Sequence, residues 1–236
     1  MKRQNNRILL VTILTVVVFL ISELIFFRTS DFKNEYKKIL GGITIPEFSG
    51  EACVILNDNV PFFREEDYTT QSYEYYSELD VLGRCGYAMG CIGRDLMPTE
   101  KRGDIGSVRP TGWHTVRYDC IEDKYLFNRC HLLAYEMTGE NANEKNLITG
   151  TRYMNATVML PFEIQVINYV KRTGNHVLYR VTPYFEGDNL LATGLILEAK
   201  SMEDGGKAVQ FCVFCYNIQP GIEINYKNGE SHLINQ

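Results

Sequence analysis

The first 28 residues carry a hydrophobic pattern unlike that of the rest of the chain. Three basic residues, Lys2, Arg3 and Arg7, precede residues 8–27, which are apolar apart from two threonines, one serine and Glu23. About 20 residues in a helix cover roughly 30 Å, the thickness of the hydrocarbon core of a membrane. The basic flank predicts that this end lies in the cytoplasm and the remainder outside. Residues 1–28 are therefore predicted to be a transmembrane signal-anchor or a cleaved signal peptide, and the lack of a small-residue cleavage site favours the anchor.

The remaining stretch is long enough for one well-packed domain, which we assign to residues 51–236. Residues 29–50 are polar and include Gly41-Gly42 and Pro46, so we interpret them as a linker or stalk. Runs rich in apolar and β-branched residues predict strands at 52–56, 113–120, 125–133, 176–183, 189–199 and 209–218. The aromatic-rich segment 62–82 and the glycine-rich segment 82–112 are expected to be loops.

The pattern in the middle of the chain predicts a hairpin followed by a helix. Residues 121–124 separate the runs 113–120 and 125–133 as a turn would. Residues 141–153 are expected to be an irregular loop, with helix from Met154 onward. Pro161 suits a helix start and Gly174 a C-terminal cap, and the apolar stripe is expected to be Ile164, Ile167 and Val170. The fold class expected from these elements is α+β with a mainly antiparallel sheet.

Residues 128–163 hold the side chains best suited to chemistry. They include His131, Glu163, two later asparagines and two arginines, all within one Asn-rich stretch. Phosphodiester hydrolysis with one hard cation needs a neutral base for water, oxygen ligands for the metal and guanidinium groups for the charge on phosphorus. This stretch supplies all three.

The run Asn128-Arg129-Cys130-His131 resembles the Asp-Arg-Gly-His signature of the DNA/RNA non-specific endonucleases, also called ββα-metal or His-Me finger nucleases. The run 146–155 is similar to the Gram-positive branch that contains DNA-entry nucleases and streptodornases. This resemblance covers roughly residues 52–229 and implies a ββα-metal motif inside the sheet, with His131 near the end of the hairpin's second strand. Asn128 replaces the aspartate of the signature, which keeps the shape and loses the charge, and Cys130 replaces the glycine.

The resemblance also implies roles for individual residues. His131 would be the general base, its neutral form taking a proton from water, with an acceptor on its other ring nitrogen. Asn155 would bind Mg²⁺, or Mn²⁺ in its place, through its amide oxygen. Glu163 would hold a water of the ion's hydration shell. Alone, these residues could equally be a core histidine, a helix N-cap and an exposed helix glutamate.

Three further residues are candidates for positioning and substrate binding. Arg129 lies two positions before His131 on a predicted strand, so both should point to one face, where Arg129 could bind phosphate or form a surface salt bridge. Arg152 is a second phosphate-binding candidate. Asn146 would orient waters around the metal or support its loop. The implied substrates are DNA and RNA, bound through phosphates with little base preference, and no organic cofactor is implied.

The charge distribution supports a phosphate-binding surface. The formal net charge is −5, but residues 145–180 hold five basic residues and one acid, or +4, whereas residues 182–204 hold five acids and one lysine, or −4. Because the basic block coincides with the candidate site, a phosphate-binding floor is favoured over an ordinary solvated face.

The seven cysteines leave their pairing open. An odd count means that at least one is free or pairs between chains. Cys85 and Cys91 flank a turn-rich stretch and are the favoured pair if any exists, whereas Cys212 and Cys215 should lie on opposite faces of one strand. A zinc site is not expected, because the single Cys-x-x-Cys has no second half.

The sequence therefore predicts a metal-dependent, extracytoplasmic endonuclease, membrane-anchored or secreted. One alternative is a non-catalytic surface receptor for nucleic acid, which the intact His131, Asn155 and Glu163 disfavour. Another is a structural or redox protein built on its cysteines. The oligomeric state and the biological role, whether uptake, scavenging or defence, are left open.

Overall fold

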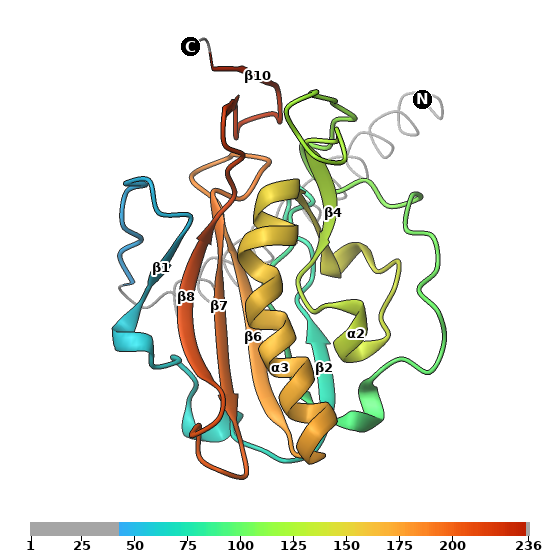
Figure 1. Cartoon of the computed structure of the whole chain (residues 1–236), viewed down its shortest axis with the longest axis vertical. Helices are drawn as coiled ribbons and strands as arrows, with labels where there is room; N and C mark the ends of the chain where they lie inside the picture. The colour runs from blue at the N-terminus through green and yellow to red at the C-terminus, as the bar shows by residue number, and fades with distance from the viewer. Residues whose placement is uncertain (1–42, 235–236) are drawn as a thin grey trace, which may run out of the picture. The chain divides into compact units, whose positions relative to one another are not determined.

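Six antiparallel strands form the central sheet of the computed structural model, which describes residues 43–234. Their order across the sheet is β1 (Cys53–Ile55), β8 (Gln210–Tyr216), β7 (Gly194–Ser201), β6 (Val177–Tyr184), β3 (Ala88–Ile92) and β2 (Tyr73–Tyr76). The long helix α3 (Leu160–Thr173) lies along one face of this sheet (Figure 1). The expected α+β class with a mainly antiparallel sheet is therefore confirmed.

The expected N-terminal membrane or signal helix, residues 1–28, and most of the expected linker lie outside the described residues. Among the residues that are described, no helix is long and apolar enough to cross a membrane.

A second, two-stranded sheet carries the candidate histidine. Strand β4 (Phe127–His131) pairs antiparallel with β5 (Leu147–Thr151), and the chain then enters the π-helical segment η5 (Met154–Met159) and continues directly into α3. Two strands followed by a helix is the expected ββα order. The expected hairpin forms only in part: residues 116–126 turn back on themselves, with a bridge between Arg117 and Tyr125 and a bond from Leu126 N to Val116 O, but the strand that pairs with β4 is β5.

The true partner strand, β5, was expected to be an irregular loop. All five of its residues are buried, and Gly150 lies opposite Asn128 in the ladder. A Cβ at Gly150 would lie 2.7 Å from the Cβ of Cys130, so only glycine allows the two strands and the helix to approach this closely. Because Thr and Gly dominate this short run, its burial is not visible as an apolar pattern.

Two other strands also lie in segments that were expected to be loops. β2 falls within the aromatic-rich segment, and β3, whose five residues are all buried, falls within the glycine-rich one. β3 reads Ala-Met-Gly-Cys-Ile, with one β-branched residue, so its composition resembles a turn-rich stretch. A side chain at Gly90 would meet the carbonyl oxygen of Tyr73 on β2, at 2.7 Å from the added Cβ.

Helix α3 ends as expected, and its buried face overlaps the expected stripe only in part. Pro161 occupies its first turn, and Gly174, at a φ of +75°, caps its end. The buried positions are Glu163, Val166, Tyr169 and Val170, whereas Ile164 is 44% exposed. Of the expected stripe, Val170 is buried and Ile167 packs partly buried against the main core, so the expectation was wrong only at Ile164.

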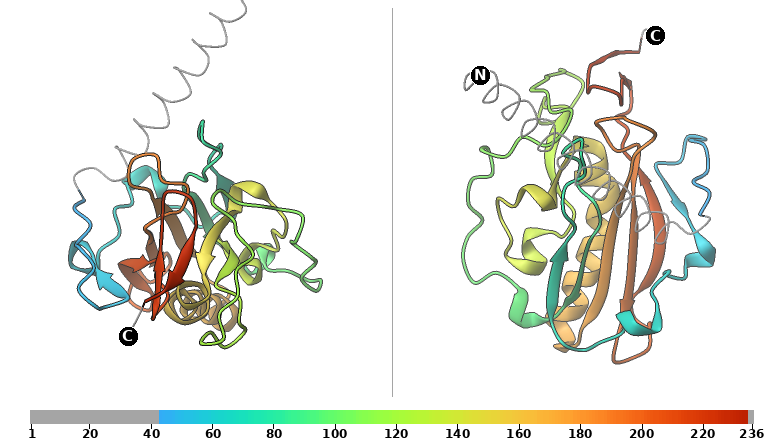
Figure 2. Two further views of the ribbon diagram at one scale, coloured as in Figure 1. Left: turned by 90° about the horizontal axis from the view of Figure 1, so that it is seen from above. Right: turned by 180° about the vertical axis from the view of Figure 1, so that it is seen from behind.

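Short elements complete the fold and cover the rest of the sheet. They are η1 (Asn57–Asn59), η2 (Glu65–Asp67), η3 (Arg94–Leu96), α2 (Tyr135–Thr138), η4 (Glu144–Asn146), β9 (Ile222–Ile224) and β10 (Ser231–Leu233). The main core lies between α3 and its side of the sheet, and includes Tyr179 and Val213. The opposite sheet face packs a smaller cluster around Phe63 and Leu178. The two views in Figure 2 show the same arrangement of helix and sheet.

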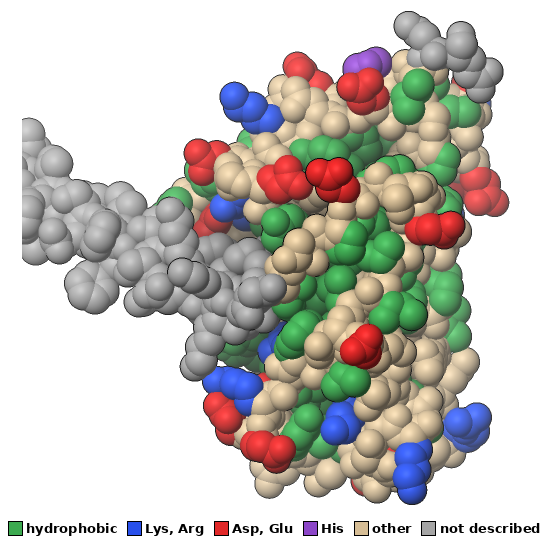
Figure 3. Space-filling model, turned by 90° about the vertical axis from the view of Figure 1, so that its left-hand side faces the viewer, with side chains coloured by type: hydrophobic (Ala, Val, Ile, Leu, Met, Phe, Trp, Pro, Cys, Tyr) green, Lys and Arg blue, Asp and Glu red, His purple; other side chains and the backbone are tan. Residues whose placement is uncertain are grey.

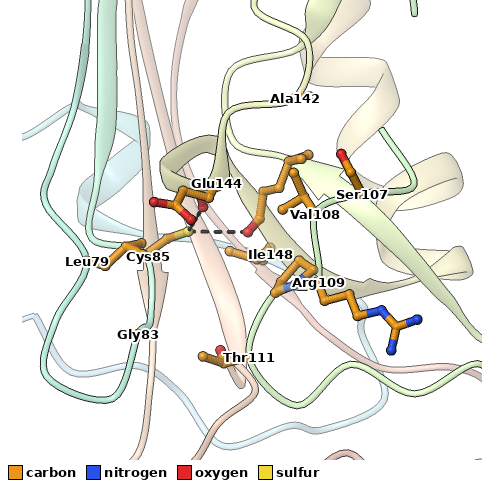
Figure 4. Close-up of a pocket in the computed structure, with 12 residues that line it drawn as sticks. Leu79, Gly83, Cys85, Ser107, Val108, Arg109, Thr111, Ala142, Glu144 and Ile148 are labelled. Atoms are coloured by element: carbon orange, nitrogen blue, oxygen red, sulfur yellow. Dashed lines mark hydrogen bonds between the residues drawn. The ribbon is translucent and has the colours of Figure 1, made fainter. Parts of the chain in front are cut away.

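The favoured cysteine pair, Cys85 and Cys91, is not formed. The Cys85 Sγ donates to the carbonyl oxygens of Glu144 and Leu147, at 3.2 and 3.3 Å, beside a pocket of about 280 Å³ (Figure 4). The Cys91 Sγ donates instead to the carbonyl oxygen of Thr69, at 3.2 Å. The two thiols therefore donate hydrogen bonds to different backbone carbonyls and not to each other.

Candidate active site

His131 is held at the end of β4 in one tautomer. Its Nε2 lies 2.8 Å from the carbonyl oxygen of Asn141, and its Nδ1 lies 3.2 Å from Nη2 of Arg102. A carbonyl can only accept a hydrogen bond and a guanidinium can only donate one. The proton of the neutral ring must therefore be on Nε2, which leaves Nδ1 with a free electron pair. The acceptor expected for the second ring nitrogen is thus the Asn141 carbonyl.

The surroundings of His131 keep its ring neutral. Burial lowers the pKa of the imidazole, and the positive charge of Arg102 lowers it further. The Asn141 carbonyl and the carboxylate of Glu136 act in the opposite direction, raising the pKa, but do not reverse the net shift. A neutral histidine with one unprotonated ring nitrogen is the form that a general base requires.

A pocket of about 450 Å³ brings the candidate phosphate-binding residues together. Its lining includes Arg102, Arg129, Arg152, Asn128 and Asn155. Within residues 43–234, β4 has a strand neighbour on one side only. Residues from both of its faces can therefore line one cleft along its free edge.

Arg129 is fixed by the segment that precedes β4. Its Nε donates to the carbonyl oxygen of Val108 at 2.5 Å, its Nη2 donates to that of Gly106 at 2.9 Å, and its guanidinium carbon lies 4.2 Å from the centre of the Trp113 ring. Two of the five N–H donors of the guanidinium are used in this way, so the others are free to bind an anion. The side chain is oriented before any substrate binds.

Arg152 lies in the same pocket with a different partner. Its Nη2 is 2.5 Å from a carboxylate oxygen of Asp123, and both side chains are partly exposed. An exposed pair of this kind contributes little to stability, so a phosphate can compete for the guanidinium at small cost.

Asn155 projects from the π-helical segment η5. Its Nδ2 donates to Oδ1 of Asn128 at 3.2 Å, whereas no described residue donates to its own Oδ1. π-helical turns occur frequently at functional sites. The amide oxygen of Asn155 is therefore available, and a neutral oxygen in a pocket with room for water is a donor that suits Mg²⁺.

Glu163 is buried one helical segment further along, on α3. It is 9% exposed, and burial raises the pKa of its carboxyl to about 7. Glu136 raises that pKa too, and Arg102 lowers it. Arg102 and Glu136 thus act on both Glu163 and His131, so all four belong to one electrostatic cluster.

Asn146 does not join the pocket. It is fully buried, its Oδ1 accepts from the backbone N–H of Leu133 at 2.8 Å, and its Nδ2 donates to the carbonyl oxygen of Leu133 at 3.0 Å. These bonds extend the β4–β5 ladder just beyond His131. Of the two roles considered for Asn146, the contacts fit loop support rather than orientation of waters.

Cys130 does not contribute a reactive thiol to the site. Its side chain is fully buried in the main core, with Sγ 3.5 Å from the sulfur of Met159. Burial raises its thiol pKa well above the ordinary value, so the nucleophilic thiolate is suppressed. The glycine-to-cysteine departure at this position is accommodated by packing.

Two members of the site were missed from the sequence. Arg102 lies 29 residues before His131 in a segment without regular structure, and Glu136 is an exposed residue of the short helix α2. The only signal for Arg102 was a basic residue in a turn-rich stretch. The local pattern gave no reason to connect it to the histidine.

The assembled geometry suits acid–base chemistry on a polyanion. Three arginines and the free amide oxygen of Asn155 line one pocket, whereas His131 and Glu163 do not line it and are linked to it through Arg102.

Comparison with known proteins is consistent with this geometry. The sequence profile of the DNA/RNA non-specific endonuclease family matches residues 64–203. A deoxyribonuclease of Streptococcus dysgalactiae subsp. equisimilis is 30% identical over 112 residues, which are 45% of this chain and 33% of that protein. The chain thus matches about a third of the length of this curated relative.

Two solved structures extend the likeness to the fold. NucA of Streptococcus agalactiae with a magnesium ion bound superposes with a TM-score of 0.72 at 25% identity, covering 87% of this chain and 96% of NucA. The Sda1 nuclease with a bound zinc ion superposes with a TM-score of 0.57 at 28% identity, covering 70% of this chain and 81% of Sda1.

Proposed function

Because the chain belongs to the DNA/RNA non-specific endonuclease family, a class of hydrolases, we propose that it cleaves phosphodiester bonds of DNA, and of RNA too, with one Mg²⁺-type cation. The observation that carries this proposal is the fixed tautomer of His131, whose unprotonated Nδ1 is held by Arg102 at 3.2 Å. Arg102 also lines the pocket that contains Arg129, Arg152 and Asn155.

His131 is the proposed general base. Its Nδ1 takes a proton from the attacking water, while the Asn141 carbonyl stabilises the imidazolium that results. Arg102 would leave Nδ1 for a phosphate oxygen when substrate enters, because a guanidinium binds an anion more strongly than a neutral ring. When Arg102 leaves, Nδ1 of His131 becomes free to act as the base, and this happens only when substrate is present.

The residues present fit a hard divalent cation. Asn155 would hold it through the free Oδ1, and Glu163 would hydrogen-bond water around it. When bound, such an ion polarises the phosphate and stabilises charge on the leaving oxygen. A cation near the Glu163 carboxyl would also favour its ionised form, which burial alone disfavours.

Substrate binding is proposed to run through phosphates. Arg129 and Arg152 each offer unused N–H donors at the pocket, and Arg129 is already oriented by two backbone carbonyls. Contacts of this kind carry no base information, so little sequence preference is expected.

The direct test is plasmid and RNA degradation by the purified full-length protein. Activity is expected with Mg²⁺ or Mn²⁺, loss on chelation with EDTA, and recovery when the ion is added back. Full activity after exhaustive dialysis against EDTA would contradict the single-metal mechanism.

The proposed location is extracytoplasmic, with residues 1–28 as an anchor or a cleaved signal. Protease added to intact cells, after removal of any wall, should digest the nuclease domain. N-terminal mass analysis with membrane fractionation separates the two forms: a soluble product that begins near Thr29 rejects the anchor. A full-length protein that resists external protease would overturn the location itself.

A further inference from the structure

Among the strands that the structure describes, β1 pairs only with β8, and the two strands place a cysteine opposite a cysteine. The register pairs Cys53 with Cys215. The backbone bonds flanking them run from Tyr216 N to Ala52 O and from Leu56 N to Cys212 O. Because hydrogen-bonded pairs alternate along an antiparallel ladder, Cys53 and Cys215 form a non-hydrogen-bonded pair, in which side chains are closest.

The two sulfur atoms are already in contact. Their Sγ–Sγ distance is 3.8 Å. The Cα atoms of a non-hydrogen-bonded pair are about 4.5 Å apart, within the range of roughly 4.4–6.8 Å found across disulfides. Rotation about the side-chain bonds can therefore bring the sulfurs to bonding distance without moving the backbone.

The other five cysteines have no comparable partner. Cys85 and Cys91 donate to backbone carbonyls, Cys130 contacts Met159, and Cys120 is exposed. Cys212 lies on the opposite face of β8, where Glu198 and Arg180 act on it. This placement confirms that Cys212 and Cys215 do not face each other.

We propose that Cys53 and Cys215 form a disulfide that fastens the edge strand β1 to the core strand β8. The bond is made by thiol–disulfide exchange with a disulfide-bearing oxidant, for which oxidised glutathione is a sufficient probe. The Cys53 thiolate attacks one sulfur of the oxidant and releases one thiol. The Cys215 thiolate then attacks the Cys53 sulfur and releases the second thiol, so that two protein thiols are oxidised and one disulfide is reduced.

The environment gives the two cysteines the different roles that this sequence needs. Cys53 is only partly buried, and the hydrogen bond from Cys215 lowers its thiol pKa, which favours the attacking thiolate. Cys215 is fully buried, and its pKa is raised by the same contact and by burial. Cys53 is therefore accessible to the oxidant, and Cys215 is close enough to Cys53 to attack it in the second step.

The disulfide would stabilise the edge strand β1, which has few other contacts with the sheet. β1 contributes three residues to the sheet, and its Ile55 is 66% exposed. Figure 3 looks onto the side of the domain on which β1 lies, where apolar side chains show between the charged groups. β8 is the opposite case, because Phe211 packs against Phe162 of α3 with ring centres 5.0 Å apart. The cross-link would tie an exposed edge to the centre of the core.

The test uses the full-length protein equilibrated with oxidised glutathione, quenched with acid, alkylated under denaturing conditions and digested. A peptide pair joining Cys53 to Cys215, lighter than the two thiol peptides by two hydrogen atoms, is expected. Cys85, Cys91, Cys130 and Cys212 should carry the alkyl label instead. Alkyl label on both Cys53 and Cys215, or a stable bond from Cys53 to glutathione or Cys120, would overturn the proposal.

Two variants sharpen the result. Cys53→Ser should abolish the cross-link and leave Cys215 alkylated, whereas Cys85→Ser, the matched control, should leave the cross-link intact. Adding reductant to the oxidised protein should lower the melting temperature by on the order of 10 °C in the wild type and not in Cys53→Ser. A wild-type melting temperature that does not respond to reductant would contradict the fastening role. Neither result depends on nuclease activity.

Discussion

The described residues contain two buried glutamates, Glu163 and Glu198, whose carboxyl groups differ in the hydrogen-bond donors around them. Glu198, on β7, is 1% exposed and accepts bonds from Arg180 at 2.7 and 2.9 Å and from the backbone N–H of Phe62 at 2.7 Å. Glu163, on α3, is 9% exposed, and burial without a hydrogen-bond donor raises its pKa to about 7. The carboxylate of Glu198 thus has hydrogen-bond donors from the described part of the chain, and the carboxyl of Glu163 does not.

The difference is the one expected between a structural charge and the functional carboxyl that we propose Glu163 to be. A buried charge with every partner supplied needs nothing more from its surroundings, although it contributes specificity more than stability. A buried carboxyl left without donors costs folding energy, and such groups gather where a ligand completes the environment. Glu163 shares Arg102 and Glu136 with His131, so the proposed partner of its carboxyl is the hydrated cation of the proposed active site.

Breaking the buried ion pair between Arg180 and Glu198 should have the largest effect on stability. Glu198→Gln leaves the Arg180 guanidinium buried and uncompensated, and we expect the free energy of unfolding to fall by about 3–5 kcal/mol. Urea unfolding followed by circular dichroism measures this change. The double variant Arg180→Met/Glu198→Leu, which removes both charges, should recover most of the loss. A double variant as unstable as Glu198→Gln would show that the charge is not the cause.

The same chemical change at Glu163 should act in the opposite direction. The folded-state pKa of Glu163, about 7, lies above the ordinary value of 4.5, so ionisation penalises the folded state. The penalty is absent below pH 4.5, grows through the interval and is complete above pH 7. Glu163→Gln should therefore stabilise the metal-free protein at pH 8 by roughly 2–3 kcal/mol and have no effect at pH 4.

Thermal unfolding in EDTA at both pH values measures this gain. Glu65→Gln, on the exposed helix η2, is the control and should change neither value. A Glu163→Gln protein that is no more stable than wild type at pH 8 would remove the distinction between the two glutamates. The same variant should lose nuclease activity despite its gain in stability.

The contact between Asn128 and Asn155 gives a third prediction, on metal affinity. Asn128 Oδ1 holds the Nδ2 of Asn155 and so turns the Asn155 oxygen outward. Asn128→Leu should weaken Mg²⁺ binding about 10–100-fold, as loss of an orienting partner does. Asn128→Asp can only accept, so it should bind the ion at least as tightly as wild type. Isothermal titration calorimetry measures the affinity for Mg²⁺. An unchanged affinity in Asn128→Leu would contradict the orienting role.

The smallest expected effect concerns the pH dependence of catalysis. The charge of Arg102 lowers the pKa of His131, and only the neutral ring is active. Arg102→Ala should raise that pKa and move the acid limb of kcat/KM to higher pH. Arg102→Lys keeps the charge and should move it less. An acid limb that stays in place, or moves to lower pH, would rule out this contact in solution.

The sequence predicted the fold class and the strands with ordinary patterns. Residues 176–183 and 209–218 correspond to β6 (Val177–Tyr184) and β8 (Gln210–Tyr216), because their β-branched and aromatic runs are long and bounded by turns. β3 and β5 were missed because glycine and small residues let neighbouring strands approach closely, which local propensity does not register. The expected apolar stripe of α3 was wrong at Ile164, because Glu163 and Val166 occupy the core-facing positions near the start of the helix.

Within the candidate site, the motif placed His131, Arg129, Asn155 and Glu163 in one region because their spacing is short and specific. Arg102 could not be placed, since its contact with His131 depends on how an irregular segment folds back over β4. Asn146 lies outside the pocket, and its contacts depend on two backbone bonds to Leu133 that only three-dimensional structure reveals.

The central claim is that base and metal ligand are separate groups, and one Mg²⁺ titration of His131→Ala tests it most directly. The imidazole touches Arg102 and Asn141 rather than the free oxygen of Asn155. The variant should therefore bind Mg²⁺ as the wild type does, while turnover on plasmid DNA falls by roughly 10²–10⁴-fold. Asn155→Ala, titrated in parallel, should lose metal affinity. A His131→Ala protein that loses Mg²⁺ binding together with its activity would contradict the separation of roles.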